Sequence, residues 1–180
     1  MVNDGRPPPT QWSGLPPGSS ADRVLANLLL TSEAATVALA QRLAPVVRAG
    51  DVLALWGDLG SGKTVFARAL VRARGRADEE VPSPTFTLAQ IYEAPDPAAA
   101  ALWHFDLYRI ADPEDAFELG LEEALAAGIS VIEWPDRLGP LLSERRLDLM
   151  LGAGDGPDSR RLTIAGDAAW KARLHEAGVV

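Results

Sequence analysis

The chain has 180 residues, of which 47% are hydrophobic and 23% charged, and its formal net charge is −8. The composition is typical of a soluble globular domain that is long enough to bury a hydrophobic core. The negative net charge argues against a general nucleic-acid-binding surface, although it allows a local basic patch or contact through a partner protein. The chain has no cysteine, no apolar run long enough to span a membrane and no basic-then-apolar leader, so we expect a cytoplasmic protein without disulfides, zinc fingers or a membrane anchor.

Residues 1–22 are predicted to form a disordered tail. They hold five of the 14 prolines, set among glycines and serines. Such a composition buries too little apolar surface to offset the loss of chain entropy on ordering. The remaining residues, 23–180, are expected to form a single domain.

The first elements expected in this domain are a strand at residues 25–30 and a helix at residues 34–48. Ser32 lies at the capping position before the helix, and Pro45 is expected to kink or shorten it. The apolar run at residues 51–56 then follows a Gly-Asp turn and is predicted to be a buried strand.

The next stretch, Gly57-Asp58-Leu59-Gly60-Ser61-Gly62-Lys63-Thr64, matches the phosphate-binding P-loop pattern G-x-x-x-x-G-K-[ST]. It lies between the predicted strand and a predicted helix at residues 65–72, which Gly75 ends. Glycines let backbone N–H groups approach a triphosphate closely, and the start of the helix adds the positive end of its dipole. Lys63 is expected to reach the β- and γ-phosphates, and the Thr64 hydroxyl to ligate Mg²⁺. The predicted nucleotide contacts are Asp58, Leu59, Gly60, Ser61, Gly62, Lys63, Thr64 and Val65.

The alternative is a glycine-rich turn that carries an incidental lysine. Lysine is rare in this chain, where Lys63 and Lys171 stand against 15 arginines. A chain that otherwise uses arginine for positive charge has a lysine where the loop requires one, which favours nucleotide binding.

Four arginines follow the loop, at Arg68, Arg72, Arg74 and Arg76. Helical spacing puts the first two on one face, which is either a solvated surface or a basic patch for RNA phosphates. The prolines at residues 81–86 favour an extended loop, which leads into a predicted hairpin of strands at residues 87–93 and 102–109.

The remaining elements follow in order. Asp112 and Pro113 are expected to open a helix that Gly120 interrupts, with a further helical piece at residues 121–127. An apolar strand at residues 129–133 ends in an acid, two strands follow at residues 146–151 and 161–164, and Asp167 is expected to cap a closing helix at residues 168–177.

Two acids are candidates to complete the nucleotide site. Asp106 and Glu133 end or punctuate apolar strands, and ligands of open α/β sheets bind at such strand ends. A buried acid is unfavourable unless a positive group neutralises it, and Mg²⁺ would do so. Hydrolysis also needs a group that orients the attacking water. The alternative is that one of these acids pairs with Arg109 or Arg137.

Three further residues near these acids are expected to be structural. A single strand histidine such as His104 is more often a hydrogen-bonded core residue than a catalyst. Tyr108 and Trp134 are expected to pack against the loop or the base, since nothing in their spacing makes either an acid or a base.

The P-loop and three further blocks resemble the TsaE (YjeE) family of bacterial P-loop ATPases. The blocks agree in order and spacing and cover roughly residues 28–152; they are Ser83-Pro84-Thr85-Phe86, His104-Phe105-Asp106-Leu107-Tyr108-Arg109 and Ile132-Glu133-Trp134-Pro135. The resemblance implies a P-loop NTPase-like, three-layer α/β fold with a mixed, largely parallel central sheet flanked by helices.

The resemblance also implies a function in making threonylcarbamoyladenosine in tRNA. The chain would hydrolyse ATP, with Mg²⁺, to reset a complex of TsaD and TsaB between rounds, without transferring the group itself and with tRNA contacted through that complex. Activity without these partners is expected to be low, and Arg109 is the nearest candidate for an arginine finger of the chain's own.

Carried onto this sequence, the family's site gives each residue a role. Lys63 and Thr64 would hold the phosphates and Mg²⁺, and the loop at residues 83–86 would sense the γ-phosphate. Asp106 and Glu133 would serve Mg²⁺ and the attacking water, with Glu133 the better candidate for the Walker B role because it ends an almost wholly apolar strand. Trp134 would lie beside the nucleotide.

Two other functions share the P-loop. A small-molecule or nucleoside kinase would also need an acceptor pocket and usually an arginine-bearing lid, and no long lid of this kind is visible in the sequence. A nucleotide-sensing interaction module would bind the nucleotide while its hydrolysis remained incidental.

Overall fold

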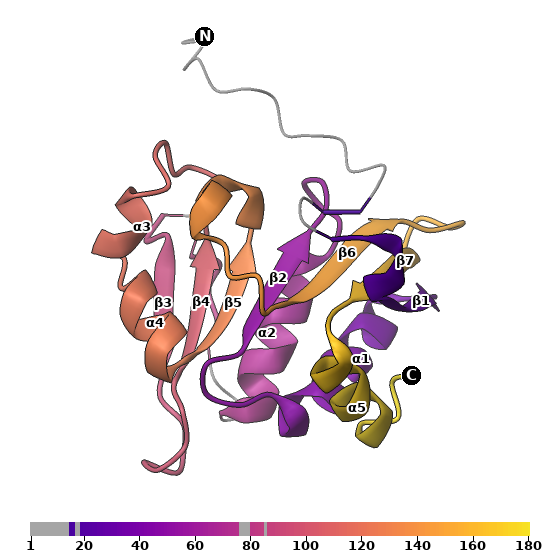
Figure 1. Cartoon of the computed structure of the whole chain (residues 1–180). Helices are drawn as coiled ribbons and strands as arrows, with labels where there is room; N and C mark the ends of the chain where they lie inside the picture. Colours follow the sequence, from indigo (N-terminus) through magenta and orange to yellow (C-terminus); the bar gives the residue numbers. More distant parts are fainter. Residues whose placement is uncertain (1–14, 17–18, 76–79, 85) are drawn as a thin grey trace, which may run out of the picture.

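The computed structural model describes residues 15–16, 19–75, 80–84 and 86–180. Within them, seven strands form one sheet in the order β1-β7-β6-β2-β5-β4-β3 (Figure 1). The strands are β1 (Val24–Leu30), β2 (Val52–Trp56), β3 (Ala89–Tyr92), β4 (Leu102–Asp106), β5 (Ile129–Glu133), β6 (Leu147–Ala153) and β7 (Arg160–Ala165). The helices are α1 (Glu33–Leu43), α2 (Lys63–Arg74), α3 (Asp115–Glu118), α4 (Leu121–Ala127) and α5 (Ala168–Glu176).

The sheet is mixed, as predicted. Its four central strands, β6, β2, β5 and β4, run parallel to one another. The outer pairings, β1 with β7, β7 with β6 and β3 with β4, are antiparallel. Parallel pairing is therefore confined to the centre, where the carboxyl ends of β2, β5 and β4 meet at one edge.

Two apolar clusters make the fold three-layered (Figure 1). On one face of the sheet, Leu53 and Leu55 of β2 pack in the cluster that contains residues of α1, α2 and α5. On the other face, Phe105 of β4 and Ile132 of β5 pack in the cluster that contains residues of α3 and α4. The alternation along each strand thus supplies apolar side chains to both layers, which confirms the predicted α/β class.

Helix ends follow the predicted capping chemistry at several places. The Ser32 Oγ accepts a hydrogen bond from the Ala35 N–H at 3.2 Å, and α1 stops at Leu43, where a 3₁₀ turn containing Pro45 takes over. The Asp167 carboxylate accepts from the Trp170 N–H at 2.9 Å at the start of α5. These residues confirm both caps and the shortening by proline.

The helix predicted to open at Asp112 starts later, at Asp115. The Asp112 carboxylate accepts from the Glu114 N–H at 3.1 Å, and its carbonyl accepts from the Asp115 N–H at 3.1 Å. Asp112 therefore closes a local turn before the helix instead of capping it. A 3₁₀ segment at Pro135–Leu141 was not predicted at all.

Most of the predicted tail, and also Arg76 and Thr85, lies outside the described residues. Just before position 23, Ala21–Arg23 form a 3₁₀ turn, and the Ser19 Oγ donates to the Asp148 Oδ2 at 2.6 Å. Pro16 is already buried, and its carbonyl accepts from the Ser19 N–H at 2.9 Å. Packing against the domain therefore begins several residues earlier than the predicted boundary.

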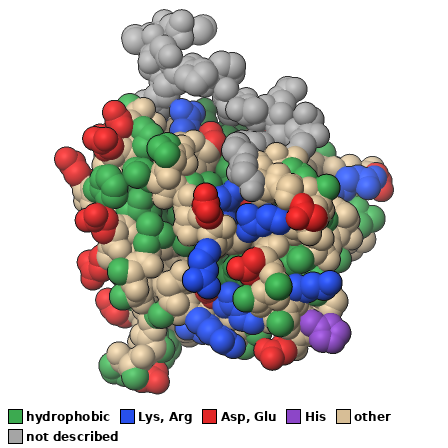
Figure 2. Space-filling model, in the orientation of Figure 1, with side chains coloured by type: hydrophobic (Ala, Val, Ile, Leu, Met, Phe, Trp, Pro, Cys, Tyr) green, Lys and Arg blue, Asp and Glu red, His purple; other side chains and the backbone are tan. Residues whose placement is uncertain are grey.

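Charge is spread unevenly over the surface. Figure 2 shows carboxylates along the side formed by α3 and α4, and Lys and Arg side chains over the middle and right of the same view. Two of the arginines that were candidates for a basic patch, Arg68 and Arg74, donate to the Val81 and Ala44 carbonyls at 2.9 and 3.2 Å. None of the described helices is long and apolar enough to traverse a lipid bilayer.

Candidate nucleotide-binding site

The P-loop connects β2 to α2, as the sequence predicts. Its backbone has positive φ at Gly57 (136°), Gly60 (77°) and Gly62 (103°), where a residue with a side chain would be strained. At Gly57 an added Cβ would also collide with the Leu151 carbonyl oxygen of β6. Glycine is thus required by backbone conformation at three positions and by close approach at one of them.

Lys63 is 4% exposed and is held inside the loop. Its Nζ donates to the Gly57 carbonyl at 2.7 Å and to the Asp58 carbonyl at 2.9 Å, and lies 4.0 Å from the centroid of the Trp134 ring. Burial lowers the pKa of the Lys63 ammonium below its ordinary value, while nearby carboxylates, Glu133 foremost, act in the opposite direction. The cation therefore lies at the loop, where a phosphate would be bound.

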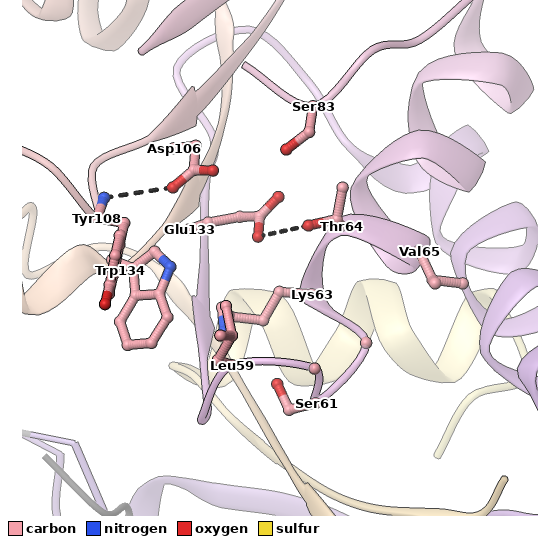
Figure 3. A pocket seen from close by; sticks show the side chains of 12 residues that line it. Leu59, Ser61, Lys63, Thr64, Val65, Ser83, Asp106, Tyr108, Glu133 and Trp134 are labelled. Atoms are coloured by element: carbon pink, nitrogen blue, oxygen red, sulfur yellow. Dashed lines mark hydrogen bonds between the residues drawn. The ribbon is translucent and has the colours of Figure 1, made fainter. Parts of the chain in front are cut away.

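Strand order brings the two acids to the same edge. Strand β5 lies between β2 and β4, and its last residue, Glu133, pairs in register with Leu55 on one side and Asp106 on the other. Both carboxylates therefore lie at the carboxyl end of the sheet, beside Lys63 and Thr64 (Figure 3).

Glu133 is 2% exposed and uses both carboxylate oxygens. Thr64 Oγ1 donates to Glu133 Oε2 at 2.9 Å, and His104 Nε2 lies 2.9 Å from Glu133 Oε1. The alternative pairing of Glu133 with Arg137 is not observed; the Arg137 Nε lies 3.9 Å from Asp136 instead. Burial raises the pKa of the Asp136 carboxyl.

His104 is buried and hydrogen-bonded, as predicted, but its partner is a candidate site residue. Sequence reasoning missed this contact. The available signal was that His104 shares a strand face with Asp106, on the strand next to the one that ends in Glu133.

Aromatic residues form the wall beyond Asp106. The Asp106 Oδ1 accepts from the Tyr108 N–H at 3.2 Å, a local turn that ends β4 before the predicted residue 109. The Tyr108 and Trp134 rings lie 4.9 Å apart between centroids, and Trp134 has a left-handed backbone with φ of 60°. Arg109, the candidate finger, lies with its guanidinium carbon 5.0 Å from the centroid of the exposed Phe86 ring.

These elements enclose a cavity of about 290 Å³ (Figure 3). It is lined by Leu59, Gly60, Ser61, Gly62, Lys63, Thr64, Val65, Ser83, Asp106, Tyr108, Glu133 and Trp134. Of the predicted nucleotide contacts, Asp58 alone is not in this lining; it borders a neighbouring cavity of about 370 Å³ on the other side of the loop. Ser83, from the predicted γ-phosphate-sensing loop, points toward the acids in Figure 3.

The oxygen atoms of this cavity fit Mg²⁺. The Thr64 hydroxyl is hydrogen-bonded to the Glu133 carboxylate, and Asp106 lines the same wall. In the part of the chain that the structure describes, no group of three or more His, Cys, Asp or Glu could hold a metal ion by itself. Mg²⁺ in nucleotide sites typically uses one or two carboxylates together with substrate phosphates, which matches such a donor set.

Comparison with known proteins places the chain in a family. Residues 30–162 match the model described as threonylcarbamoyl adenosine biosynthesis protein TsaE. Proteins named tRNA threonylcarbamoyladenosine biosynthesis protein TsaE from Rickettsia conorii and Mycobacterium leprae are 39% and 40% identical to this chain; the matches cover 70% and 64% of this chain and 70% and 75% of theirs. The crystal structure of YdiB from Bacillus subtilis is similar with a TM-score of 0.67 at 25% identity, over 85% of this chain and 93% of that one. The blocks with the P-loop, Asp106 and Glu133 all fall inside the matched residues, and the chain belongs to the TsaE family, named for the biosynthesis of threonylcarbamoyladenosine in tRNA.

Proposed function

We propose that this chain binds ATP with Mg²⁺ and hydrolyses it during threonylcarbamoyladenosine formation in tRNA, acting in the cytoplasm with TsaB and TsaD and not transferring the group itself. The observation that carries the proposal is the 2.9 Å hydrogen bond between the Thr64 hydroxyl and the Glu133 carboxylate. P-loop NTPases hold their metal between a hydroxyl at the end of the loop and an acid at the tip of a neighbouring strand. Family membership supports the tRNA pathway.

The proposed role of each site residue follows from its position in the cavity. Backbone N–H groups of the loop and the start of α2 bind the phosphates, and Lys63 exchanges the Gly57 and Asp58 carbonyls for phosphate oxygens. Because Glu133 is bonded to Thr64, we assign these two to the metal side, which leaves Asp106 to orient the attacking water. When bound, Mg²⁺ would neutralise charge on the β- and γ-phosphates.

The residues of the cavity wall support the proposal that the rate of ATP hydrolysis depends on a partner protein. Lys63 is the one Lys or Arg among the described residues that line it. Arg109 lies instead against the Phe86 ring at the outside. Since an arginine that contacts the transferred phosphoryl group accelerates many P-loop hydrolases by orders of magnitude, a site without one is expected to be slow until a partner completes it.

The test is phosphate release by the purified chain, alone and with the TsaB–TsaD pair. We expect slow release alone and faster release with the pair. Glu133→Gln should retain ATP binding and lose most release, Lys63→Ala should lose binding, and Glu122→Gln, on the exposed side of α4, should behave as wild type.

Other outcomes would support the alternatives. Phosphorylation of an added nucleoside, with little free phosphate, would identify a kinase. Full support of tRNA modification by Glu133→Gln, together with loss of partner binding in Lys63→Ala, would identify a sensing module instead of an ATPase.

A further inference from the structure

A guanidinium group lies against the outer side of the P-loop. The Arg160 Nε donates to the Ser61 carbonyl at 3.0 Å, and its Nη2 donates to the Gly60 carbonyl at 3.2 Å. Its Nη1 donates to the Pro157 and Ser159 carbonyls at 2.9 and 2.8 Å. Within the described residues, every hydrogen bond of this side chain goes to a backbone carbonyl, so Arg160 joins the loop to the turn between β6 and β7.

The sheet carries Arg160 to this position. Strand β6 pairs with β2 as far as Trp56 opposite Met150 and then continues to Ala153, which pairs with Arg160 of β7. The β6–β7 hairpin therefore extends beyond the end of β2, to the level of the P-loop (Figure 1). The close approach of Gly57 to the Leu151 carbonyl shows that the loop packs directly on this extension.

The direction of the held carbonyls matters for phosphate binding. In a trans peptide the C=O and the following N–H point in opposite directions. A guanidinium that fixes the Gly60 and Ser61 carbonyls outward therefore fixes the N–H groups of Ser61 and Gly62 on the opposite side of the loop. The Ser61 N–H donates there to the Asp58 carbonyl at 3.1 Å, which Lys63 also holds. A positive charge at the carbonyl end also polarises each of these peptide units, which strengthens its N–H as a donor to an anion.

Lys63 and Arg160 hold different halves of the loop. Lys63 holds the Gly57 and Asp58 carbonyls, but it has to leave them to reach a phosphate. Arg160 approaches from the opposite side and can remain in place. We propose that Arg160 is a positioning residue for nucleotide binding, which holds the loop's amide groups in their phosphate-binding arrangement while Lys63 moves; this role rests on the proposed function.

The experiment measures ATP affinity by titration with a fluorescent ATP analogue, and kcat and KM for phosphate release with TsaB–TsaD present. The variants are Arg160→Ala, Arg160→Lys and Arg160→Gln. The matched control is Arg161→Ala, because Arg161 is the next residue of β7, is exposed and pairs with Asp155. Melting temperatures without nucleotide give the stability of each variant.

We expect Arg160→Ala to bind ATP about tenfold more weakly or worse, since two hydrogen bonds from a charged donor are lost. The KM should rise similarly, whereas kcat at saturating ATP should stay within about twofold, because Arg160 contacts the loop and not the reacting atoms. Arg160→Lys retains the charge without the two-armed geometry, and Arg160→Gln retains a donor without the charge, so both should be intermediate. Arg161→Ala should match wild type.

Wild-type affinity in Arg160→Ala, or an equal loss in Arg161→Ala, would overturn the role of Arg160 and leave the proposed function standing. If Arg160→Ala does not fold, the Lys and Gln variants decide, and wild-type affinity in both overturns the role. Absence of ATP binding in the wild-type chain would overturn the proposed function and this role together.

Discussion

Each oxygen of the Glu133 carboxylate has its own partner, Thr64 on one side and His104 on the other. His104 is fully buried, and within the described residues its Nδ1 has no hydrogen-bond partner. Because a carboxylate oxygen accepts hydrogen bonds, the contact is satisfied when His104 Nε2–H donates to Glu133 Oε1. The contact with His104 thereby holds the Glu133 carboxylate in the orientation in which it accepts a hydrogen bond from Thr64.

If Glu133 serves Mg²⁺ as proposed, His104→Ala should lower kcat for ATP hydrolysis about tenfold, because residues that orient such a carboxylate typically have effects of this size. ATP affinity should change little, since His104 does not line the cavity. His104→Gln, which can still donate to Glu133, should recover much of the loss. His175→Ala serves as the control, because His175 is the other histidine of the sequence and is exposed on α5. A fall in affinity with unchanged kcat would contradict this role.

Lys63 makes the stability of the fold depend on pH. Burial lowers its pKa in the folded state, whereas the unfolded chain has the ordinary value of 10.5. In the window between the folded-state pKa and 10.5, the unfolded state binds more protons, so the free energy of unfolding rises with pH. As pH approaches 10.5 from below, wild type should therefore gain stability relative to Lys63→Met. Denaturant unfolding of both proteins at several pH values measures this difference, and a difference that stayed constant with pH would refute it.

At the scale of whole elements, α4 packs closely on Trp103 of β4 because a glycine flanks each end of the helix. An added Cβ at Gly120, where φ is +84°, would lie 2.6 Å from the Trp103 ring, and one at Gly128 would lie 2.6 Å from the other end of the same indole. The Trp103 ring also stacks on Phe105, with centroids 6.1 Å apart. The close approach of the helix thus packs the strand whose last residue is Asp106.

Gly120→Ala should lower the free energy of unfolding by about 2 kcal/mol, because a Cβ there is strained by the backbone and overlaps Trp103. Gly152→Ala in β6 is the matched control, since an added Cβ there meets nothing within 4 Å. Urea denaturation measures the free energy of unfolding of both variants and of wild type. Equal losses of unfolding free energy in the two variants would show that the contact with Trp103 is not the reason why position 120 requires glycine.

Local patterns predicted the elements of the site well. The P-loop was readable from its own residues, and the apolar run before Glu133 marked a buried strand. What could not be predicted depends on strand order: Arg160 reaches the loop because β6 neighbours β2, and His104 reaches Glu133 because β4 neighbours β5. No periodicity within one segment encodes such neighbours. The later start of α3 has a local cause, since an Asp-Pro pair suits a turn as well as a cap.

Across the whole molecule, Asp148 links the first described residues to the centre of the sheet. It is fully buried on β6, and its carboxylate accepts from the Trp56 Nε1 at 2.8 Å, from the Arg146 Nε at 2.6 Å and from the Ser19 Oγ at 2.6 Å. A buried carboxylate is stable only when it is surrounded by such donors.

A chain that begins at Leu15 should therefore keep the stability and ATP affinity of the full chain, because it retains Pro16, which is buried and whose carbonyl accepts from the Ser19 N–H at 2.9 Å. Ser19→Ala in the full chain should lower the free energy of unfolding by about 1 kcal/mol, because a donor to a charged acceptor is lost. Thr31→Ala removes a hydroxyl from an exposed position and is the control. Loss of the fold in the shortened chain would show that residues 1–14 are also needed by the domain.

The contacts of Lys63 also have a consequence for how long a nucleotide stays bound. Two carbonyls and an indole face already engage the ammonium, so an arriving phosphate replaces good partners and gains only the difference. After loss of the terminal phosphate, a bound diphosphate would compete less well with those partners, and the Lys63 ammonium could return to the Gly57 and Asp58 carbonyls. If the chain hydrolyses ATP as proposed, we therefore expect the diphosphate product to leave the loop readily, which suits a protein proposed to act in repeated rounds.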